Sequence, residues 1–587
     1  MASQWVQNDA DQAKEAREDL GIWPLDEHNV KLLNEVHPRN FVTEMKDAPH
    51  AEYDLIAIGS GAGGLVSSKQ TARRGGRSAM ISEQLAGGDC LNVGCVPSKA
   101  LIRSARAVSQ IRKAASVGID IKGDIVVDFP RIMERLRQRR ASIAPADGHP
   151  GTEATGCHVY QGRGKLTGAN TLEVNGQTLK FKYCILAMGG RPMIPGNIPG
   201  LKEAPYTTNE RLFNLEELPP RMVILGAGMF IYLYICLYVW LSDYFHHDIN
   251  DACVMSDSNV AADSLCFFLL LFSLPSCELF FVPFYEPNNQ PPKGVIALEM
   301  AQAFSLLGTK VTVVNRSSRL FESKGGDPEA ASIMQAELEK DGATFLSSSK
   351  IENIETLRDD NDGLPLMNIK VSGDDSEIEC ECLLVAVGRM ANVENCGLEG
   401  NVDFEVGKGV VVDDYARSVS NPSVFAVGDC CAGVPRLTHM AGEMAKMVVQ
   451  NSLAKDEWKL SSLVVPSVAY TEPELATVGI ASEDQAIRQG IDCEVYRTGL
   501  EHNDRALLEN SNVGFVKIVV KKGTDEILGA TIVAERAGEM VNEVTLAMKN
   551  NLGLYAIGRN IHSYPTTGEA VMGCGLQYVN KHLPRFD

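Results

Sequence analysis

The sequence predicts an α/β protein of three or four domains that ends in an α+β domain. Its 587 residues are too many for one hydrophobic core, because single cores stop growing at about 250–300 residues. From Tyr53, and again from Arg221, short apolar runs end in glycines and lead into helical stretches, which is typical of βαβ units and a parallel sheet. From about Leu463, strand-like runs such as GFVKIVV and ILGATIVA dominate and precede a helical segment, Met540–Asn550. Residues 1–50 are polar and are predicted to be an N-terminal extension.

The composition favours a soluble globular protein and disfavours nucleic acid or a membrane as partner. The apolar fraction is 45%, the charged fraction 22% and the formal net charge −20, whereas both partners require clustered Lys and Arg. One basic run, Arg131–Arg140, is predicted to be a solvated helix face. The acidic N-terminus has no signal-peptide or transit-peptide character, and the fifteen cysteines have no regular spacing. We therefore expect a reducing, cytoplasmic location, with a mitochondrial one as the alternative.

A glycine-rich turn follows the first predicted strand, YDLIAI. Gly59, Gly61 and Gly64 fit a G-x-G-x-x-G dinucleotide-binding turn, in which glycines allow a tight turn, backbone approach to a pyrophosphate, and helix–strand packing. The helix N-terminus would then face the phosphates. The next predicted strand ends on Glu83, whose carboxylate can accept hydrogen bonds from ribose hydroxyls. An ordinary glycine turn is the alternative, but the strand, glycines and acid in register favour a nucleotide site.

Two cysteines, Cys90 and Cys95, follow in the segment GGDCLNVGCVPSK. Cysteines five residues apart can meet in the first turn of a helix, where the positive helix end lowers a thiol pKa. The segment therefore favours a redox disulfide. The alternatives are half of a zinc site or two buried cysteines. No second ligand pair follows that would complete a zinc site, so we expect no bound metal.

The stretch GGDCLNVGCVPSKALI resembles the class I pyridine nucleotide–disulfide oxidoreductases, which include dihydrolipoamide dehydrogenase, glutathione reductase and mercuric reductase. The resemblance is strongest to the mercuric-reductase-like branch. It implies two Rossmann-like domains, which bind FAD and NAD(P), and a C-terminal α+β dimerisation domain. The implied ranges are 51–205 for the first part of the FAD domain, 206–389 for the NAD(P) domain, 390–462 for the return of the FAD domain, and 463–587 for the dimerisation domain.

The resemblance also implies roles for residues near the disulfide. Cys95 would be the thiol next to the flavin, and Cys90 the interchange thiol that attacks substrate. Lys99 would lie beneath the flavin ring, paired with a glutamate from the second nucleotide domain. Three later segments resemble family motifs that surround FAD, namely Ala187–Pro192, Val424–Asp429 and Leu437–Ala441. The residues of these segments expected at the cofactor are Gly189, Gly428 and Asp429. An ordinary turn residue is the alternative for the aspartate.

The second predicted nucleotide turn is interrupted. The strand RMVIL leads into Gly226 and Gly228, but the expected helix begins only at Val295, after residues 229–294. Deleting this segment restores GAGVIALEMAQAF, a G-x-G-x-x-A fingerprint that ends on Ala297. The phosphate site requires the helix to begin at the turn, so we expect a genuine insert here to damage nucleotide binding.

Residues 229–294 also differ in composition from the rest of the chain. They hold 14 of the 38 aromatic residues and 4 of the 15 cysteines. A membrane hairpin is one interpretation, but the first apolar run has only thirteen residues, and the second contains two prolines and a glutamate. We favour a translated intron, because a pyrimidine-rich intron end read as codons gives runs such as FFLLLFSLP. A genuine insert would displace the helix that carries Glu299, the expected partner of Lys99.

The end of the second strand in this domain indicates the nicotinamide cofactor. An acid there favours NAD through the ribose 2′-hydroxyl, but this chain has Asn315, followed by Arg316 and Arg319. Losing the acid and gaining two guanidiniums favours the 2′-phosphate of NADPH. NADH is the alternative, with both arginines facing solvent.

The C-terminal motif IHSYPTTGE departs from the family pattern. In the dihydrolipoamide and glutathione enzymes, a histidine immediately before this proline is the acid–base residue, oriented by the glutamate and supplied across the dimer interface. Here that position is Tyr564, with His562 two residues earlier and Glu569 retained. A phenol with a pKa of about 10 is a poor proton acceptor at neutral pH. His562 is therefore the candidate substitute.

These features predict a homodimeric, FAD-dependent NAD(P)H oxidoreductase that passes electrons through Cys90 and Cys95 to a small-molecule disulfide or a soft metal. Mercuric reductases have a tyrosine near the C-terminal motif, which fits soft-metal chemistry. They also carry a C-terminal vicinal cysteine pair and an N-terminal C-x-x-C module, and this chain has neither. The vicinal Cys430 and Cys431 are predicted to be structural. The alternatives are a dihydrolipoamide dehydrogenase and a flavin-binding protein inactivated by the insert.

Overall fold

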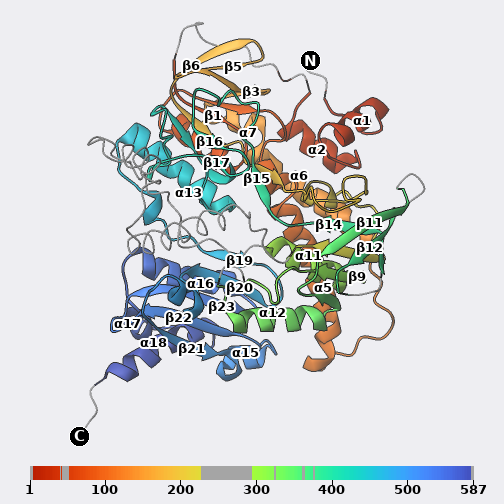
Figure 1. Ribbon diagram of the computed structural model, residues 1–587, viewed down its shortest axis with the longest axis vertical. Coiled ribbons are helices and arrows are strands. Elements are labelled where there is room, and N and C mark those ends of the chain that lie inside the picture. Colours follow the sequence, from red (N-terminus) through yellow and green to blue (C-terminus); the bar gives the residue numbers. More distant parts are fainter. Residues whose placement is uncertain are drawn as a thin grey trace, which may run out of the picture. The chain divides into compact units, whose positions relative to one another are not determined.

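The computed structural model describes residues 4–39, 41, 52–226, 294–322, 325–359, 364–373 and 377–583. The chain divides into two compact units, and the second, Phe230–Phe284, lies outside the described residues, as does most of the predicted insert. In the first unit, strands and helices alternate up to about residue 460, and an antiparallel sheet with helices follows (Figure 1). The predicted mixed α/β class is confirmed.

The first sheet is built around β1 (Glu52–Ile58), which is buried over its apolar residues. β2 (Ser78–Ser82) and β6 (Gln177–Leu186) flank β1 in parallel. The order is β3-β2-β1-β6-β5-β4, and β18 (Val424–Ala426) returns from far along the chain to pair in parallel with β6. The other strands are β3 (His158–Gln161), β4 (Lys165–Gly168) and β5 (Thr171–Val174). The parallel strands end at one edge, where open α/β sheets bind ligands.

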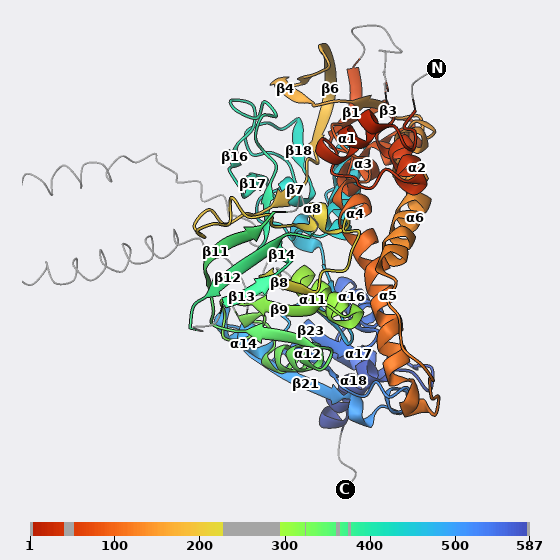
Figure 2. The ribbon, with the colours of Figure 1, turned by 90° about the vertical axis from the view of Figure 1, so that its right-hand side faces the viewer.

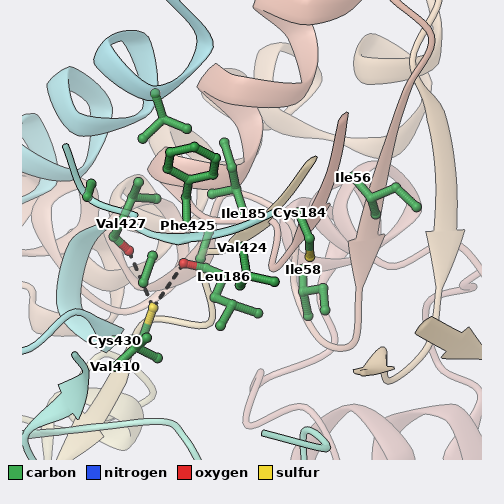
Figure 3. Packing of buried hydrophobic residues seen from close by; sticks show 14 of the residues in the cluster. Ile56, Ile58, Cys184, Ile185, Leu186, Val410, Val424, Phe425, Val427 and Cys430 are labelled. Atoms are coloured by element: carbon green, nitrogen blue, oxygen red, sulfur yellow. Dashed lines mark hydrogen bonds between the residues drawn. The ribbon is translucent and has the colours of Figure 1, made fainter. Parts of the chain in front are cut away.

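Helix α3 (Ala62–Arg73) packs on β1 and β2, and α13 (Thr438–Val449) packs on α3. Figure 3 shows part of the core between these elements, where Phe425 and Val427 lie near Leu186. The buried Cys430 thiol donates hydrogen bonds to the carbonyl oxygens of Leu186, at 3.1 Å, and Val427, at 3.4 Å (Figure 3). These contacts agree with the structural role predicted for this cysteine.

The second sheet repeats the topology of the first. Its strands are all parallel in the order β10-β9-β8-β14, with bounds β8 (Arg221–Leu225), β9 (Lys310–Val314), β10 (Ala343–Leu346) and β14 (Cys382–Val385). Helix α11 (Val295–Leu307) is mostly apolar and almost wholly buried, and its polar residues Glu299, Gln302 and Ser305 are buried as well. The remaining elements are α12 (Pro328–Lys340) and an antiparallel sheet of β11 (Ile351–Arg358), β12 (Leu366–Val371) and β13 (Glu377–Cys380).

The C-terminal sheet is antiparallel in the order β19-β20-β23-β22-β21. Its strands are β19 (Ser467–Ala469), β20 (Glu474–Gly479), β21 (Cys493–Gly499), β22 (Phe515–Lys521) and β23 (Ile527–Ala534). Helix α16 (Ala537–Lys549) packs on β20 and β23, and α18 (Glu569–His582) packs on β21 and β22. The other helices are α14 (Glu483–Arg488), α15 (Asp504–Leu508) and α17 (Leu554–Arg559). This is the α+β domain expected from the strand-rich C-terminal sequence.

The N-terminal segment, residues 4–39, is folded, although the sequence analysis assigned it no structure. It forms α1 (Ala10–Glu18) and α2 (Glu27–Val36), and α2 packs against α6 (Phe129–Asp147), as Figure 2 shows. Trp5 and the apolar residues of α2 share a buried cluster with residues of the first domain. The largely polar composition of the N-terminal segment therefore gave no indication of the small apolar face on α2.

The basic run was predicted to be a solvated helix face, and this prediction is wrong for two of its arginines. Arg137 and Arg140 are buried in α6. Arg137 forms an ion pair with Asp26 at 2.5 Å, and Arg140 donates to Asn29 and Asn92. Burial is possible because both guanidiniums donate to acceptors on other elements.

The remaining elements connect the three sheets. They are α4 (Gly88–Asn92), α5 (Cys95–Lys113), α7 (His149–Glu153), α8 (Asn209–Leu212), β7 (Gly190–Pro192), β15 (Arg389–Ala391), β16 (Phe404–Glu405) and β17 (Gly409–Val410). Within the described ranges, no helix is both long and apolar enough to cross a membrane.

Candidate functional site

The first glycine turn has the geometry that a phosphate site needs. Gly59 has a φ of +113°, and a Cβ there would lie 2.2 Å from the Ala187 carbonyl oxygen. A Cβ on Gly64 would lie 1.8 Å from the oxygen of Gly59, so only glycine lets α3 approach β1 this closely. Gly61 is the N-cap of α3. The carboxylate of Glu83, at the end of β2, pairs with Arg163 at 2.5 Å.

The second turn repeats this geometry where it is described. Gly226 has a φ of +124°, and a Cβ there would lie 2.5 Å from the Ala386 oxygen. Gly294 is the N-cap of α11, as Gly61 is of α3, and Ala297 follows three residues later, fully buried. Gly228 lies outside the described residues. Both turns thus begin with a glycine that other residues could not replace without strain.

The two redox cysteines lie on consecutive helices. Cys90 belongs to the short helix α4, and Cys95 is the first residue of α5. Both are free thiols here. Cys95 Sγ lies 3.4 Å from Thr438 Oγ1 at the start of α13. This contact brings together the motif of the cysteines and a later motif that the family resemblance associated with the flavin.

The two thiols have different acidities. The hydrogen bond from Cys90 lowers the pKa of Cys95 to about 6, and the Thr438 hydroxyl and the nearby Lys99 charge act in the same direction. The same hydrogen bond, together with burial, raises the pKa of Cys90. The reduced pair is therefore a Cys95 thiolate that accepts a hydrogen bond from the Cys90 thiol, with the thiolate at the positive end of α5.

Lys99 and Glu299 form the ion pair that the resemblance implied. Their Nζ and Oε2 atoms are 2.8 Å apart, and the carboxylate is buried. The insert was expected to displace α11 and to break this pair. That expectation is wrong, because α11 packs directly against α5. Tyr470, which the sequence analysis missed, completes the group: its backbone N–H donates to Glu299 at 3.0 Å, and Lys99 Nζ lies 4.4 Å from its ring centroid.

Asp429 is linked to the segment that carries the two cysteines by Arg389, a residue that was not predicted from the sequence. Arg389 donates to Asp429 at 3.0 Å and also pairs with Asp89, the residue before Cys90. Gly428 has a φ of +71°, so the turn that presents the aspartate favours glycine. Gly189, with a φ of +68°, lies next to Gly190, the first residue of β7. These contacts join the segment that carries the two cysteines to two of the later family motifs, Ala187–Pro192 and Val424–Asp429.

The predicted nicotinamide-specificity residues follow β9. The Asn315 side chain is buried and bonds to Ser317 through both its oxygen and its nitrogen, so no acid stands at the strand end. Arg319 donates to the Gly326 oxygen at 3.0 Å and lies 3.5 Å from Asp484. Arg316 is exposed.

In the C-terminal motif, the histidine and the glutamate form hydrogen bonds with other residues and not with each other. His562 Nε2 lies 2.9 Å from an oxygen of Glu543 on α16, whereas Glu569 accepts from the Thr566 backbone N–H at 3.0 Å. The expectation that Glu569 orients the histidine is therefore corrected. The phenol of Tyr564 donates to the Asp504 carboxylate at 2.8 Å, which raises its pKa. Tyr564 therefore keeps its proton at neutral pH and cannot serve as the general base.

A search of the described residues finds no cluster of three or more His, Cys, Asp or Glu side chains that could hold a metal ion.

A family model described as "Pyridine nucleotide-disulphide oxidoreductase" matches residues 53–230 and 294–445, more than half of the chain. The dimerisation-domain model of the same family matches residues 465–573. The chain belongs to the pyridine nucleotide-disulphide oxidoreductase family. The family resemblance predicted from the cysteine motif is confirmed, and so is the C-terminal dimerisation domain.

Named relatives of this family member include two kinds of enzyme. The dihydrolipoyl dehydrogenase of Chlamydia muridarum (strain MoPn / Nigg) is 28% identical over 540 residues, which cover 91% of this chain and 98% of the relative. The mercuric reductase of Staphylococcus aureus is 26% identical over 527 residues, 90% of this chain and 82% of the relative. The solved HOCl-induced flavoprotein disulfide reductase RclA from Escherichia coli shares the fold, with a TM-score of 0.67, 21% identity, and coverage of 88% of this chain and 98% of that one.

The predicted activity class is also confirmed. The chain is a flavoprotein oxidoreductase of a family that acts on sulfur groups or mercury, with a flavin and a pyridine nucleotide as the implied cofactors. The glycine turns of both sheets fit such groups, because each follows a buried strand and leads into the N-terminus of a helix, where backbone N–H groups can bind phosphates.

The acidity of Cys95 predicts a pH profile for its alkylation. A thiolate reacts and a thiol does not, so the rate at Cys95 should be high at neutral pH and should fall as pH drops through about 6, the pKa of this thiol. Cys90 should react slowly over the same range. The measurement is iodoacetamide labelling of the reduced protein from about pH 4 to about pH 9, read by peptide mass spectrometry. A Cys95 midpoint at the value of an ordinary thiol would contradict the assignment.

Proposed function

We propose that this chain is an FAD-dependent NADPH oxidoreductase that delivers electrons through Cys90 and Cys95 to a small-molecule disulfide or a soft-metal ion. The observation that carries the proposal is the unequal thiol pair beside the Lys99–Glu299 ion pair. FAD, when bound, would supply the two-electron relay between the nicotinamide and the cysteines. Reducing the disulfide to one thiol and one thiolate takes up two electrons and one proton. Returning both electrons to a substrate disulfide, with one further proton, releases two thiols and restores the internal S–S bond.

The residues proposed to bind FAD lie mainly in turns that follow strands of the first sheet, and those proposed to bind the nicotinamide dinucleotide lie at the turn of the second. Gly59, Gly61 and Gly64 would cradle the FAD pyrophosphate and Glu83 the ribose. Gly189, Gly428 and Asp429 would line the path toward the flavin. Lys99 would hold its charge near the ring, balanced by Glu299. The second turn, with Gly226, Gly228 and Ala297, would bind the nicotinamide dinucleotide.

NADPH is proposed over NADH because β9 ends without an acid and is followed by Arg316. Replacing Arg316 with glutamate should raise the KM for NADPH by about tenfold or more, since a 2′-phosphate would meet a carboxylate in place of a guanidinium. The KM for NADH should change little. Steady-state kinetics with both nucleotides check this. Equal effects on the two nucleotides would instead favour NADH as the cofactor, with Arg316 and Arg319 facing solvent and not contacting the nucleotide.

A substrate panel tests the proposed reaction. Purified protein would be assayed with NADPH and either a low-molecular-weight disulfide or Hg(II) with excess thiol, and separately with dihydrolipoamide and NAD. Turnover with the first pair supports the proposal. Turnover only with dihydrolipoamide and NAD supports a dihydrolipoamide dehydrogenase, the function named for the first relative. Retained flavin without turnover in any assay supports the inactive alternative.

A homodimer is proposed from the dimerisation domain and its exposed apolar side chains. Ile561 is 93% exposed and Tyr564 72% exposed, next to His562. Across a dimer interface, these residues would face the partner's cysteines. Sedimentation should therefore give a dimer, and Ile561→Glu should shift it toward monomer and lower turnover at least about tenfold, because burying a charge is costly. A fully active monomer would contradict this. We also propose a cytoplasmic location, because the described cysteines are free thiols and form no structural disulfide framework, with mitochondria as the alternative.

Residues 229–294 are proposed to be a translated intron. The family match stops at residue 230 and resumes at 294, which supports this interpretation. Deleting 228–293 instead of 229–294 gives the same GAGVIALE sequence, because Gly294 takes the place of Gly228. Sequencing the transcript tests the proposal directly. A transcript that encodes residues 229–294, or a peptide from the protein that lies wholly within them, would overturn the proposal.

A further inference from the structure

The short helix that carries Cys90 is anchored by the N-terminal segment, residues 4–39. Leu91, the next residue, packs into the hydrophobic cluster formed with the apolar side chains of α2. Just before α4, the backbone N–H of Ala86 donates to the oxygen of Val36 at 3.0 Å. The segment therefore contacts the cysteine loop through side chains and through backbone.

A buried polar chain runs from α2 to the backbone between the two cysteines. Arg140 is fully buried and donates to the Asn92 carbonyl oxygen at 2.7 Å and to Asn29 Oδ1 at 2.6 Å. The Asn92 side chain donates in turn to the oxygens of Ala86 and Gly88, each at 2.9 Å. One guanidinium thus joins the N-terminal segment to the residue midway between Cys90 and Cys95.

The residues between the two cysteines are held from several sides. Asn92 is fixed through both its backbone and its side chain, and the oxygen of Val93 accepts from Asn209 Nδ2 at 3.1 Å. The distance between the two sulfurs depends on this short connection. Arg140 Nε is buried without a hydrogen-bond partner, so losing Asn29 would leave a second nitrogen of the same guanidinium unpaired, which is costly and should weaken its hold on Asn92.

We propose that Asn29, in the N-terminal segment, is a positioning residue which, through Arg140, holds Cys90 in hydrogen-bond contact with Cys95. The inference rests on the proposed function for the role of the two cysteines. The N-terminal segment acts on the two cysteines through the residues around them that it contacts, so its effect should be seen in the acidity and reactivity of the thiols.

The test is the alkylation profile of Cys95 in the reduced, full-length chain. Asn29→Ala should weaken the hydrogen bond from Cys90 and lower the ionisation constant of Cys95 about three- to tenfold, which moves the midpoint upward. Asn29→Asp keeps an oxygen that accepts from Arg140 and should restore most of the wild-type profile. Asn34→Ala is the matched control: among the described residues, the Asn34 side chain bonds to the Trp5 backbone, within the segment itself, and the profile should not change.

An unchanged profile in folded Asn29→Ala would overturn the inference, as would an equal shift in Asn34→Ala. Circular dichroism establishes folding, and if Asn29→Ala does not fold, Arg140→Lys decides by the same comparison, because a single ammonium nitrogen cannot occupy the two positions from which Nη1 and Nη2 donate. The assay uses neither nucleotide nor substrate. A wild-type protein without a reactive Cys95 thiolate would contradict the proposed function and this inference together. A normal wild-type profile that Asn29→Ala leaves unchanged would contradict the inference alone.

Discussion

Cys95→Ser should abolish the long-wavelength absorption expected from a thiolate beside the flavin, whereas Cys90→Ser should keep it and still lose turnover by a factor on the order of 1,000 or more. Cys95 begins α5, has a pKa of about 6 and lies near Lys99. Cys90 has a raised pKa and would be the thiol that exchanges with substrate. The measurement is the visible spectrum of each variant, together with NADPH-dependent turnover.

The control for this pair is Cys493→Ser. Cys493 is a free, partly exposed thiol on β21, away from the helices of the redox cysteines, and its replacement should leave spectrum and turnover as they are. In Cys95→Ser, the partner thiol that raises the pKa of Cys90 is gone, so Cys90 should become open to alkylation. Loss of the band in both redox variants, or in Cys90→Ser alone, would mean that the roles are reversed or that the pair does not lie at the flavin.

Deleting residues 229–294 should increase the rate of flavin reduction by NADPH at least about a hundredfold. Helix α11 keeps its place against α5 in the full chain, but the glycine turn before it is interrupted after Gly228 in the sequence. The phosphates need two or more charge-assisted hydrogen bonds from an uninterrupted turn and helix start, each worth about 1.5–3 kcal/mol. In the sequence, 66 residues separate Gly228 from Val295. Closing such a loop costs about 4 kcal/mol on the flexible-chain estimate, so the deletion should also raise the unfolding temperature. Stopped-flow absorbance and calorimetry measure the two effects.

The first domain provides the control for the deletion. The Lys99–Glu299 ion pair is present in the full chain, so flavin content and the alkylation profile of Cys95 should be alike in the two proteins. Equal rates of flavin reduction would show that the segment does not disturb the nucleotide site. Loss of flavin from the deleted protein would show that the segment is part of the fold.

The turns and strands of both sheets could be predicted because their causes are local. Gly59 and Gly226 end buried strands at positive φ, where a Cβ would strike the next strand's carbonyl, and this requirement is visible as a glycine after an apolar run. The helix start at Cys95 could be anticipated from the proline two residues later. Lys99 and Glu299 could be paired only through the family resemblance, since 200 residues separate them.

The residues that were missed act over long sequence distances. Arg389 joins Asp89 to Asp429, and Tyr470 reaches Glu299 from the third sheet, contacts that periodicity does not encode. The N-terminal helices did carry a local signal, because Asp26 caps α2 and apolar residues recur along it at helical spacing. The overall polarity of residues 1–50 outweighed this signal. The burial of Arg140 could not be predicted, because its acceptors lie on other elements.

The central claim is that electrons from a nicotinamide cofactor reach the Cys90–Cys95 pair and leave Cys95 as a thiolate beside the flavin. The most direct test is an anaerobic titration of the oxidised, flavin-loaded protein lacking residues 229–294 with NADPH, followed by absorbance. We predict that the first two electrons produce a long-wavelength band while the main flavin absorption persists, because the electrons reside on the cysteines. Immediate bleaching of the flavin without that band would contradict the account.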